Sequence, residues 1–237
     1  LSPDKPWEGR RSYLYGTVLP NEAGDGYRMW YQSYNEHGNF GGRRGYGNAY
    51  ATSKDGINWV KPNLGVFRWM NSTRNNMFLV RKHSPGDDHN PQIFHTPWDK
   101  DPRKKYRMIT FAYAANRKKT RSDEGYWGSF SPDGIHWTKL DVPGIPSSDE
   151  SNFSYNPKDG LFIHTGKRGG PHGRSVALAT SRDFETWTDY GVVFHADELD
   201  QELGKKRIKA RLADPIRHRP CYDIPQTYNV DGGQWMS

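Results

Sequence analysis

A phrase of seven residues that begins with Ser, carries Asp at its third position and ends with Trp occurs three times in this 237-residue chain. The copies are Ser53–Trp59, Ser131–Trp137 and Ser181–Trp187. Each copy follows a stretch in which apolar and polar residues alternate, as they do in a half-buried β-strand. A turn of fixed chemistry that recurs along a chain indicates an all-β repeat architecture.

The chemistry of the phrase predicts a tight turn between two strands. Gly56 and Gly134 follow the Asp in the first two copies, and glycine adopts positive φ at little cost. The Ser and Asp side chains can accept hydrogen bonds from nearby backbone N–H groups. The third copy has Phe184 in place of the glycine, so we expect its turn to differ in detail.

The residues before each turn also repeat. Tyr27–Tyr31 is echoed by Tyr106–Thr110, and Gly160–His164 is a looser third copy. Each unit therefore contains four antiparallel strands, which is the blade of a β-propeller. The best helical candidate is Ala196–Ala213, which has acidic residues early and basic residues late, as the helix dipole favours.

We therefore predict an all-β fold, a β-propeller of four-stranded antiparallel blades that occupies residues 1–237 as a single domain. The blades are expected at roughly 8–70, 86–145 and 149–196, and 197–237 is expected to hold a helix, a loop and the start of a further blade. An open propeller exposes strand edges, so we also expect self-association through them.

Composition narrows the function classes. Aromatic residues make up 14% of the chain although apolar residues reach only 33%, which is typical of a propeller or of a surface on which sugars stack. The net charge is +7, but the basic residues are scattered without a nucleic-acid-binding motif, so nucleic acid is not an expected partner. No apolar run approaches the roughly 20 residues that a membrane span needs.

The chain gives few signs of a metal, a disulfide or a targeting segment. Cys221 is the only cysteine, which excludes an intramolecular disulfide. His83, His89 and His95 recur every six residues, but the intervening prolines prevent one straight strand, so we predict neither a metal site nor a cofactor. The chain shows no signal peptide and opens without Met; we expect removal of an upstream segment and a secreted or periplasmic location.

The alternation of strands predicts which loops share an edge. The lead-in to the first strand of a blade and the loop between its second and third strands lie on one edge, and the repeated turns lie on the other. On the first edge, the loops at 35–44, 116–121 and 166–174 are basic and mostly rich in glycine, and the lead-ins at 87–90 and 149–152 are acidic. Function is commonly placed on variable loops of a rigid scaffold, so this edge is the predicted active face.

The strands and turns together resemble the five-bladed β-propeller glycoside hydrolases, the superfamily of invertases, levansucrases, arabinanases and β-xylosidases. The motifs that carry the resemblance are Tyr27–Tyr31, Tyr50–Trp59 and Asp149–Pro157, and they match an uncharacterised branch of the superfamily. The similarity spans about residue 10 to residue 231. Three full blades are fewer than five, so we expect an incomplete ring.

The resemblance implies three carboxylates at the starts of inner strands around a central funnel: an acid, a base or nucleophile, and a residue that orients the sugar. The nearest candidate in the first blade is Glu8. The invertase signatures are absent, so fructosidase activity is not expected. The positions that match the catalytic carboxylates are Asp88, Asp149 or Glu150, and Asp231. The acids of the repeated turns, Asp55, Asp133 and Asp183, are predicted to be structural.

Basic residues on the same edge indicate the substrate. Arginine binds carboxylate or sulfate groups at two points, so we predict an anionic polysaccharide, uronic or sulfated; the alternative is a solvated basic edge. The predicted substrate-binding residues are Arg43, Arg44, His89, Lys167, Arg168, His172 and Arg174.

The predicted function is hydrolysis of an oligo- or polysaccharide by paired carboxyl groups, one protonated and one ionised. One alternative is a non-catalytic carbohydrate-binding propeller or a fragment of one. The other is a sialidase-like enzyme. The repeated Asp boxes of sialidases place glycine two residues after the Asp, whereas Gly56 and Gly134 follow it directly.

Overall fold

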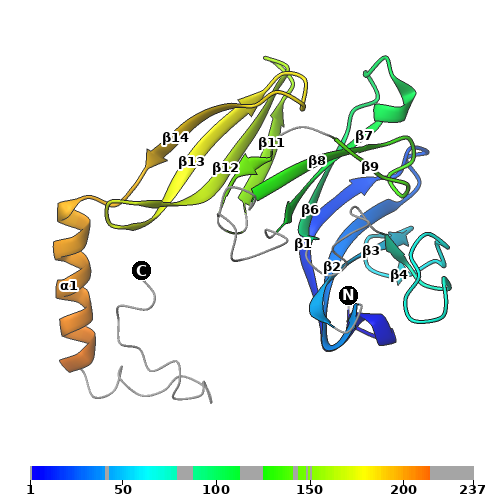
Figure 1. Cartoon of the computed structure of the whole chain (residues 1–237), viewed down its shortest axis with the longest axis horizontal. Helices are drawn as coiled ribbons and strands as arrows, with labels where there is room; N and C mark the ends of the chain where they lie inside the picture. Colours follow the sequence, from blue (N-terminus) through cyan, green and yellow to red (C-terminus); the bar gives the residue numbers. More distant parts are fainter. Residues whose placement is uncertain are drawn as a thin grey trace. The chain divides into compact units, whose positions relative to one another are not determined.

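The computed structural model describes residues 2–40, 43–78, 88–112, 125–140, 144–147, 149 and 151–213. These residues form three antiparallel sheets and one long helix, α1 (Glu198–Ala213) (Figure 1). They fall into two compact units, one comprising Leu1–Glu150 with Ser181–Trp187 and the other comprising Ser151–Thr180 with Thr188–Ser237. The prediction of an all-β fold is confirmed, and the predicted helix is present.

The three sheets are made of consecutive stretches of the chain, and the first reaches Met77–Phe78, beyond the predicted 8–70. The strands of the first are β1 (Arg11–Pro20), β2 (Tyr27–Phe40), β3 (Arg43–Ser53), β4 (Trp59–Val60) and β5 (Met77–Phe78). Those of the second are β6 (Asp88–His95), β7 (Tyr106–Ala112), β8 (Gly125–Ser131), β9 (Thr138–Lys139) and β10 (Ile145–Pro146). Those of the third are β11 (Ser151–Asn156), β12 (Leu161–Gly170), β13 (Gly173–Ser181) and β14 (Thr188–Phe194).

The strand order follows the predicted meander, with one difference. In the first sheet, β4 and β5 both pair with β3, and in the second, β9 and β10 both pair with β8. The fourth strand of these two blades is therefore broken into two short pieces. The third sheet keeps the order β11-β12-β13-β14 with a continuous fourth strand.

The three repeated turns share one backbone conformation. In each, the Ser hydroxyl accepts a hydrogen bond from the N–H three residues later, at 2.9 Å for Gly56 and 2.8 Å for Gly134 and Phe184. Phe184 adopts a φ of 69°, close to the 76° of Gly56 and the 78° of Gly134. The expectation of a different third turn is wrong, because burial of the Phe184 ring against Phe94, with centroids 6.0 Å apart, offsets the cost of the left-handed backbone.

The turn acids are used to hold these turns. Asp133 accepts backbone N–H groups from Ile135 and His136 at 2.8 Å each. Partial burial raises the pKa of Asp133, but the hydrogen bonds from His136, Ile135 and Ser131 outweigh it and lower that pKa to about 2. Its carboxylate therefore stays ionised at neutral pH and serves the turn, as the sequence predicts.

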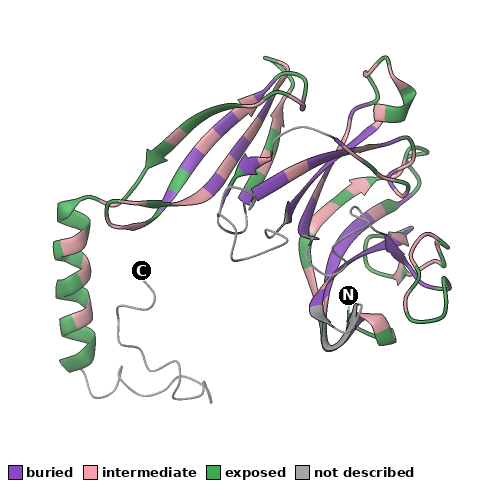
Figure 2. Cartoon of the chain, in the orientation of Figure 1, coloured by how far each residue is buried: buried purple, intermediate pink, exposed green. Residues whose placement is uncertain are grey.

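Within the first unit, an arginine links the first two sheets. Arg28 donates hydrogen bonds to the hydroxyls of Tyr50 and Tyr106, both at 2.7 Å, and to the carbonyl of Asp133. The apolar cluster beside it, which includes Trp30, draws residues from both sheets. Figure 2 shows β8 of the second sheet as mostly buried. The Tyr-Arg-Met repeat is thus a contact between blades as well as a strand.

Replacing Arg28 with Met is expected to lower the free energy of unfolding by about 3 kcal/mol, because several charge-assisted hydrogen bonds are lost. Urea unfolding measures the change. The matched control is Arg103→Met, since the Arg103 side chain is 75% exposed and pairs with Asp101 on the surface; we expect a change under about 1 kcal/mol. Equal effects of the two substitutions would contradict the linking role.

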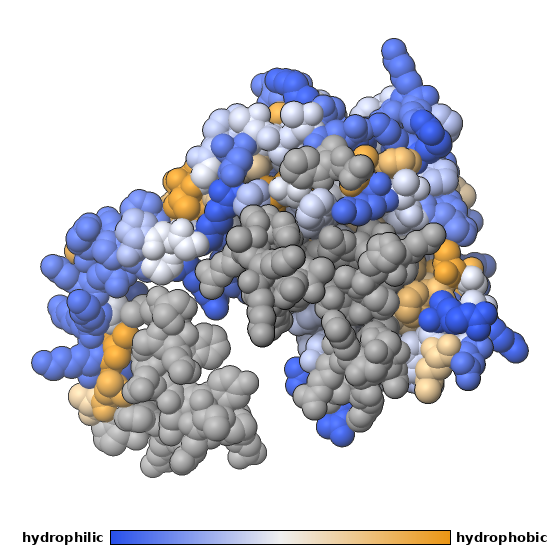
Figure 3. Space-filling view, in the orientation of Figure 1, coloured by the Kyte–Doolittle hydropathy of each residue, from blue (hydrophilic) through white to orange (hydrophobic). Residues whose placement is uncertain are grey.

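The second unit contains the third sheet and α1. On β12, His164 is fully buried and its ring stacks on Phe153 with the centroids 4.4 Å apart. Burial, assisted by the nearby Arg168 guanidinium, lowers the pKa of His164 from 6.5 to about 4. Hydrophobic residues also lie along the mostly polar α1 (Figure 3), among them the exposed Leu199 and Leu203.

The lowered pKa of His164 predicts acid sensitivity. The unfolded chain takes up a proton near pH 6.5, whereas the folded unit resists it down to about pH 4. The free energy of unfolding therefore has its full value above pH 6.5. It decreases as the pH falls toward 4, by up to about 3 kcal/mol. Urea midpoints between pH 7.5 and 4.5 test this, and His164→Phe should flatten the profile. An unchanged pH dependence in that variant would refute the assignment.

Candidate active site

The registers within the sheets confirm the predicted shared edge. In the second sheet, Asp88 pairs with Ala112, which pairs with Gly125. The first strand thus begins where the second ends and the third begins. At the opposite end of the sheet, Tyr106 pairs with Ser131, the first residue of the repeated turn. In the third sheet, Ser151 likewise pairs with Gly166 at the start of β11.

The first residues of β6 depart from regular strand geometry. The register with β7 shifts between His89 and Gln92. Asn90 has a φ of 56°, a left-handed conformation that is uncommon for a residue other than glycine, and it precedes Pro91. Bulges and strained backbones are frequent beside functional sites because they redirect a side chain. The irregularity adjoins Asp88, the predicted catalytic residue.

Hydrogen bonds from two blades hold Asn90 in this conformation. Its N–H donates to Gln32 Oε1 at 3.0 Å, and its Nδ2 donates to the Tyr126 hydroxyl at 2.6 Å. Gln32 and Tyr126 are fully buried, and Asn90 is 4% exposed. Hydrogen bonds in a buried, low-dielectric setting are strong, so the start of β6 is anchored to both the first and the second sheet.

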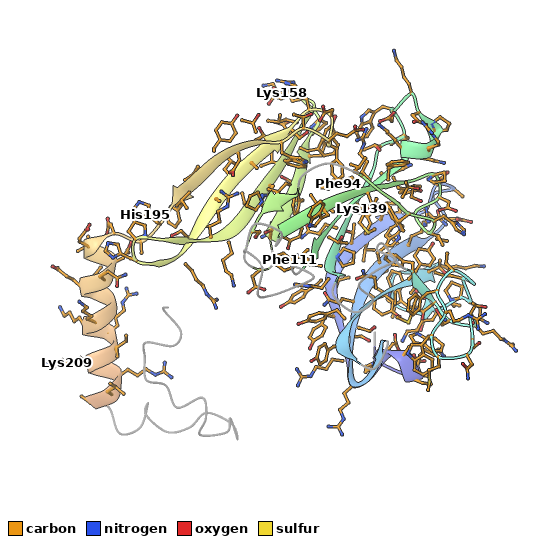
Figure 4. All side chains as sticks on the ribbon, in the orientation of Figure 1. Phe94, Phe111, Lys139, Lys158, His195 and Lys209 are labelled. Atoms are coloured by element: carbon orange, nitrogen blue, oxygen red, sulfur yellow. The ribbon has the colours of Figure 1, made fainter. Side chains whose placement is uncertain are left out.

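His89 lies next to this anchor and supports it from inside. Its ring is 1% exposed and sits 4.8 Å from each of the rings of Tyr46 and Phe111. Figure 4 labels Phe111, which belongs to β7. The sequence predicts substrate binding by His89, but its buried position is that of a residue that packs the edge.

The second predicted carboxylate reaches the same edge through β10. Pro146 pairs with Gly125, so it lies three strands from Asp88, about 14 Å at the usual strand spacing. Asp149 follows three residues later and is half-buried; its carbonyl accepts a hydrogen bond from the Ser147 hydroxyl at 3.1 Å. Three residues span up to about 10 Å, so the spacing is compatible with an approach of Asp149 to the start of β6.

The other predicted catalytic positions fall outside what the structure describes. Glu150 and Asp231 lie outside the described residues, and Asp88 is described only through its backbone. Glu8, the first-blade candidate, is fully buried. Its carboxylate accepts hydrogen bonds from the backbone N–H groups of Asp4 and Lys5, from Tyr31 and from Lys61. It therefore holds the N-terminal segment and has no exposed oxygen for a substrate.

Two of the predicted substrate-binding residues have acidic partners. In the second unit, Arg168 pairs with Asp189 at 2.9 Å, and His172 lies 3.3 Å from Glu198. Arg174 on β13 is exposed, and Lys167 on β12 is half-buried. Arg43 and Arg44 open β3, but their side chains lie outside the described residues.

Sequence reasoning missed the residues that anchor β6. Gln32 directly follows the Tyr27–Tyr31 repeat, and Asn90 precedes a proline. An Asn-Pro pair indicates a turn or a break in a strand, and that signal was available. Nothing in the sequence pairs Gln32 with Asn90, because the two residues belong to different blades.

The described part of the chain contains neither a metal-binding cluster nor a membrane-spanning helix. No group of three or more His, Cys, Asp or Glu residues there could hold a metal ion. The helices in the described ranges are too short or too polar to cross a bilayer.

Comparison with known proteins bears on the fold. No protein-family model matches the sequence, and no curated protein matches it. Solved structures that match include glycoside hydrolases.

One of these is Zg3597, a family 117 glycoside hydrolase from Zobellia galactanivorans, with a TM-score of 0.52 and 17% identity over 83% of this chain and 50% of that one. A glycosyl hydrolase from Bacteroides ovatus gives a TM-score of 0.47 and 16% identity over 78% of this chain and 50% of that one. Fructan 1-exohydrolase IIa from Cichorium intybus gives 0.43 and 15% over 70% and 29%. The chain spans about half the length of the two bacterial structures, and it shares its fold with Zg3597.

Proposed function

We propose that this protein hydrolyses glycosidic bonds of an oligo- or polysaccharide at the edge where β6 begins. The observation that carries the proposal is the anchored start of β6. Gln32 and Tyr126 fix Asn90 in a left-handed conformation two residues after Asp88. Catalytic side chains need such rigid support, and the fold shared with a glycoside hydrolase supports the reaction class.

The proposed mechanism uses Asp88 and Asp149 as a pair. One carboxyl group is protonated and donates to the leaving oxygen, while the other is ionised and either activates water or attacks the sugar. The required separation of about 5 to 10 Å lies within the range that strand spacing allows for these two residues. Mutual repulsion and partial burial would raise the pKa of one carboxyl group and make it the acid. Glu150 and Asp231 are proposed to orient the sugar.

The proposed substrate class is anionic, either uronic or sulfated. Arg43, Arg44, Lys167 and Arg174 are proposed to contact its acidic groups. Arg168 and His172 have carboxylate partners, Asp189 and Glu198, so we propose that they contribute less to substrate binding.

A panel of uronic, sulfated and neutral glycans tests the proposal through release of reducing ends. We expect release from anionic members, decreasing between about 50 and 500 mM NaCl as salt screens the basic edge. Release from neutral glycans alone would overturn the anionic assignment. Binding without any release would instead favour a non-catalytic carbohydrate-binding protein, and release of terminal sialic acid alone would favour the sialidase alternative.

A further inference from the structure

The second half of α1 carries a dense group of positive charges. Between residues 205 and 211, every residue except Ile208 and Ala210 is basic: Lys205, Lys206, Arg207, Lys209 and Arg211. All five basic side chains are exposed, and Figure 4 labels Lys209 on the helix. With a rise of about 1.5 Å per residue, the group occupies about 9 Å of the helix axis.

These basic residues have no carboxylate partner in the part of the chain that the structure describes. None of them forms an ion pair there, although Glu202 lies one turn before Lys206. By contrast, Arg168 and His172 in the same unit each face an acidic side chain. The positive charge of residues 205–211 therefore faces solvent.

The stability of α1 does not account for this group. Cations complement the helix dipole in the last turn, and of the five only Arg211 lies there. Lys205 lies four residues before Lys209, and such like-charged pairs destabilise a helix. Arg207 and Arg211 form a second pair of this kind. Because no residue of α1 is buried, little packing offsets the repulsion, whereas a bound anion would relieve it.

The apolar residues of α1 argue against a lipid surface as the partner. Leu199 and Leu203 lie on one side of the helix. At about 100° per residue, Ile208 and Leu212 lie on the opposite side. A helix that binds in the plane of a membrane gathers its apolar residues on one face, and α1 has no such face.

The first half of α1 argues against a nucleic-acid duplex. This half is acidic, with Glu198, Asp200 and Glu202, and a duplex carries one phosphate charge for about every 1.7 Å of its axis. A duplex aligned with the helix, which is about 24 Å long, would bring phosphates against these carboxylates. Residues 205–211 also contain no aromatic side chain on which the bases of a single strand could stack.

We infer that residues 205–211, which we call the α1 basic segment, bind a sulfated polysaccharide. A flexible glycan that carries sulfates on separate sugar units can contact this short segment without reaching the acidic half of the helix. Clusters of lysine and arginine of this length are typical of polyanion-binding surfaces. The surface belongs to the second unit and uses none of the residues assigned to catalysis, so the inference does not depend on glycan hydrolysis.

Dextran sulfate is a suitable probe, and uncharged dextran of the same length is its control. Calorimetric titration of the full chain at about 50 mM NaCl should show binding of dextran sulfate and none of dextran. The affinity should decrease as NaCl is raised toward about 500 mM, because salt screens contacts between exposed charges.

A triple variant locates the binding. Lys205→Gln, Lys206→Gln and Lys209→Gln together should raise the Kd for dextran sulfate about tenfold, since three exposed charge contacts are lost. Glutamine forms helices about as well as lysine, so α1 should be retained, and circular dichroism checks this.

The matched control removes three exposed lysines from other parts of the chain and lowers the net charge by the same amount. It combines Lys54→Gln, Lys100→Gln and Lys158→Gln. Because these lysines are distant from one another in the sequence and do not form a cluster, the Kd should change less than about twofold.

Three results would overturn the inference. Equal weakening in the two triple variants would show that net charge alone attracts the polysaccharide. Unchanged binding in the α1 variant would place the polysaccharide on another surface. Tighter binding of a DNA duplex than of dextran sulfate at the same NaCl concentration would make nucleic acid the partner.

Discussion

Replacing Asp88 with Asn should reduce glycan hydrolysis about 10²- to 10⁴-fold, the usual contribution of a positioned acid or base. Asn matches the shape of the carboxyl group but neither releases nor accepts the proton. Because Gln32 and Tyr126 hold this strand through Asn90, the substitution should leave the fold intact. The measurement is kcat/KM on whichever glycan of the panel is cleaved.

Asp149→Asn should cause a loss of similar size, because both halves of the acid and base pair are needed. The matched control is Asp133→Asn, which changes a carboxylate that holds a repeated turn. It should lower the urea midpoint and preserve kcat/KM per folded molecule. If neither Asp88→Asn nor Asp149→Asn alters hydrolysis, the catalytic assignment is wrong.

Replacing Glu8 with Ala should lower the free energy of unfolding by about 3–5 kcal/mol, as expected when one partner of a buried charged network is removed. Lys61, whose side chain is 5% exposed, would lose its buried partner at 2.8 Å. Burial raises the pKa of the Tyr31 hydroxyl, and its hydrogen bond to Glu8 raises it further. That hydroxyl therefore stays a donor and would also lose its acceptor. Urea unfolding measures the change.

Asp4→Ala is the control for Glu8, because Asp4 pairs with the same Lys61 but its side chain is 58% exposed. We expect a change under about 1 kcal/mol. Glu8→Gln separates structure from catalysis: a variant that stays as stable as the wild type but loses hydrolysis would return Glu8 to the candidate acids.

Most of the strands and turns could be predicted from the sequence because the residues that form each turn are close together in the chain. The Ser and Asp of each repeated turn bond to N–H groups within three residues, as at Ser53 and Asp55. Such turns fix the phase of the strands, and phase decides which loops share an edge. The edge that these loops share could therefore be predicted without any knowledge of packing.

The features that were missed depend on contacts between distant residues. In the sequence, Arg28 is only one residue of a predicted strand. Its hydrogen bond to the Asp133 carbonyl is visible only in the folded chain. The left-handed φ of Phe184 becomes acceptable only when Phe94 and Arg107 surround the ring. The break in the fourth strands likewise depends on tertiary pairing, since β5 and β10 have only two residues each.

The continuous fourth strand of the third blade has a practical consequence. In the first two sheets, the fourth strand consists of two separate pieces of two residues each. Such short edge strands are poor templates for pairing with another chain. By contrast, β14 spans Thr188–Phe194 as one strand, with two register shifts against β13, and Val193 and Phe194 are 52% and 71% exposed. We expect association in concentrated preparations to involve this exposed strand, and Val193→Lys should reduce it.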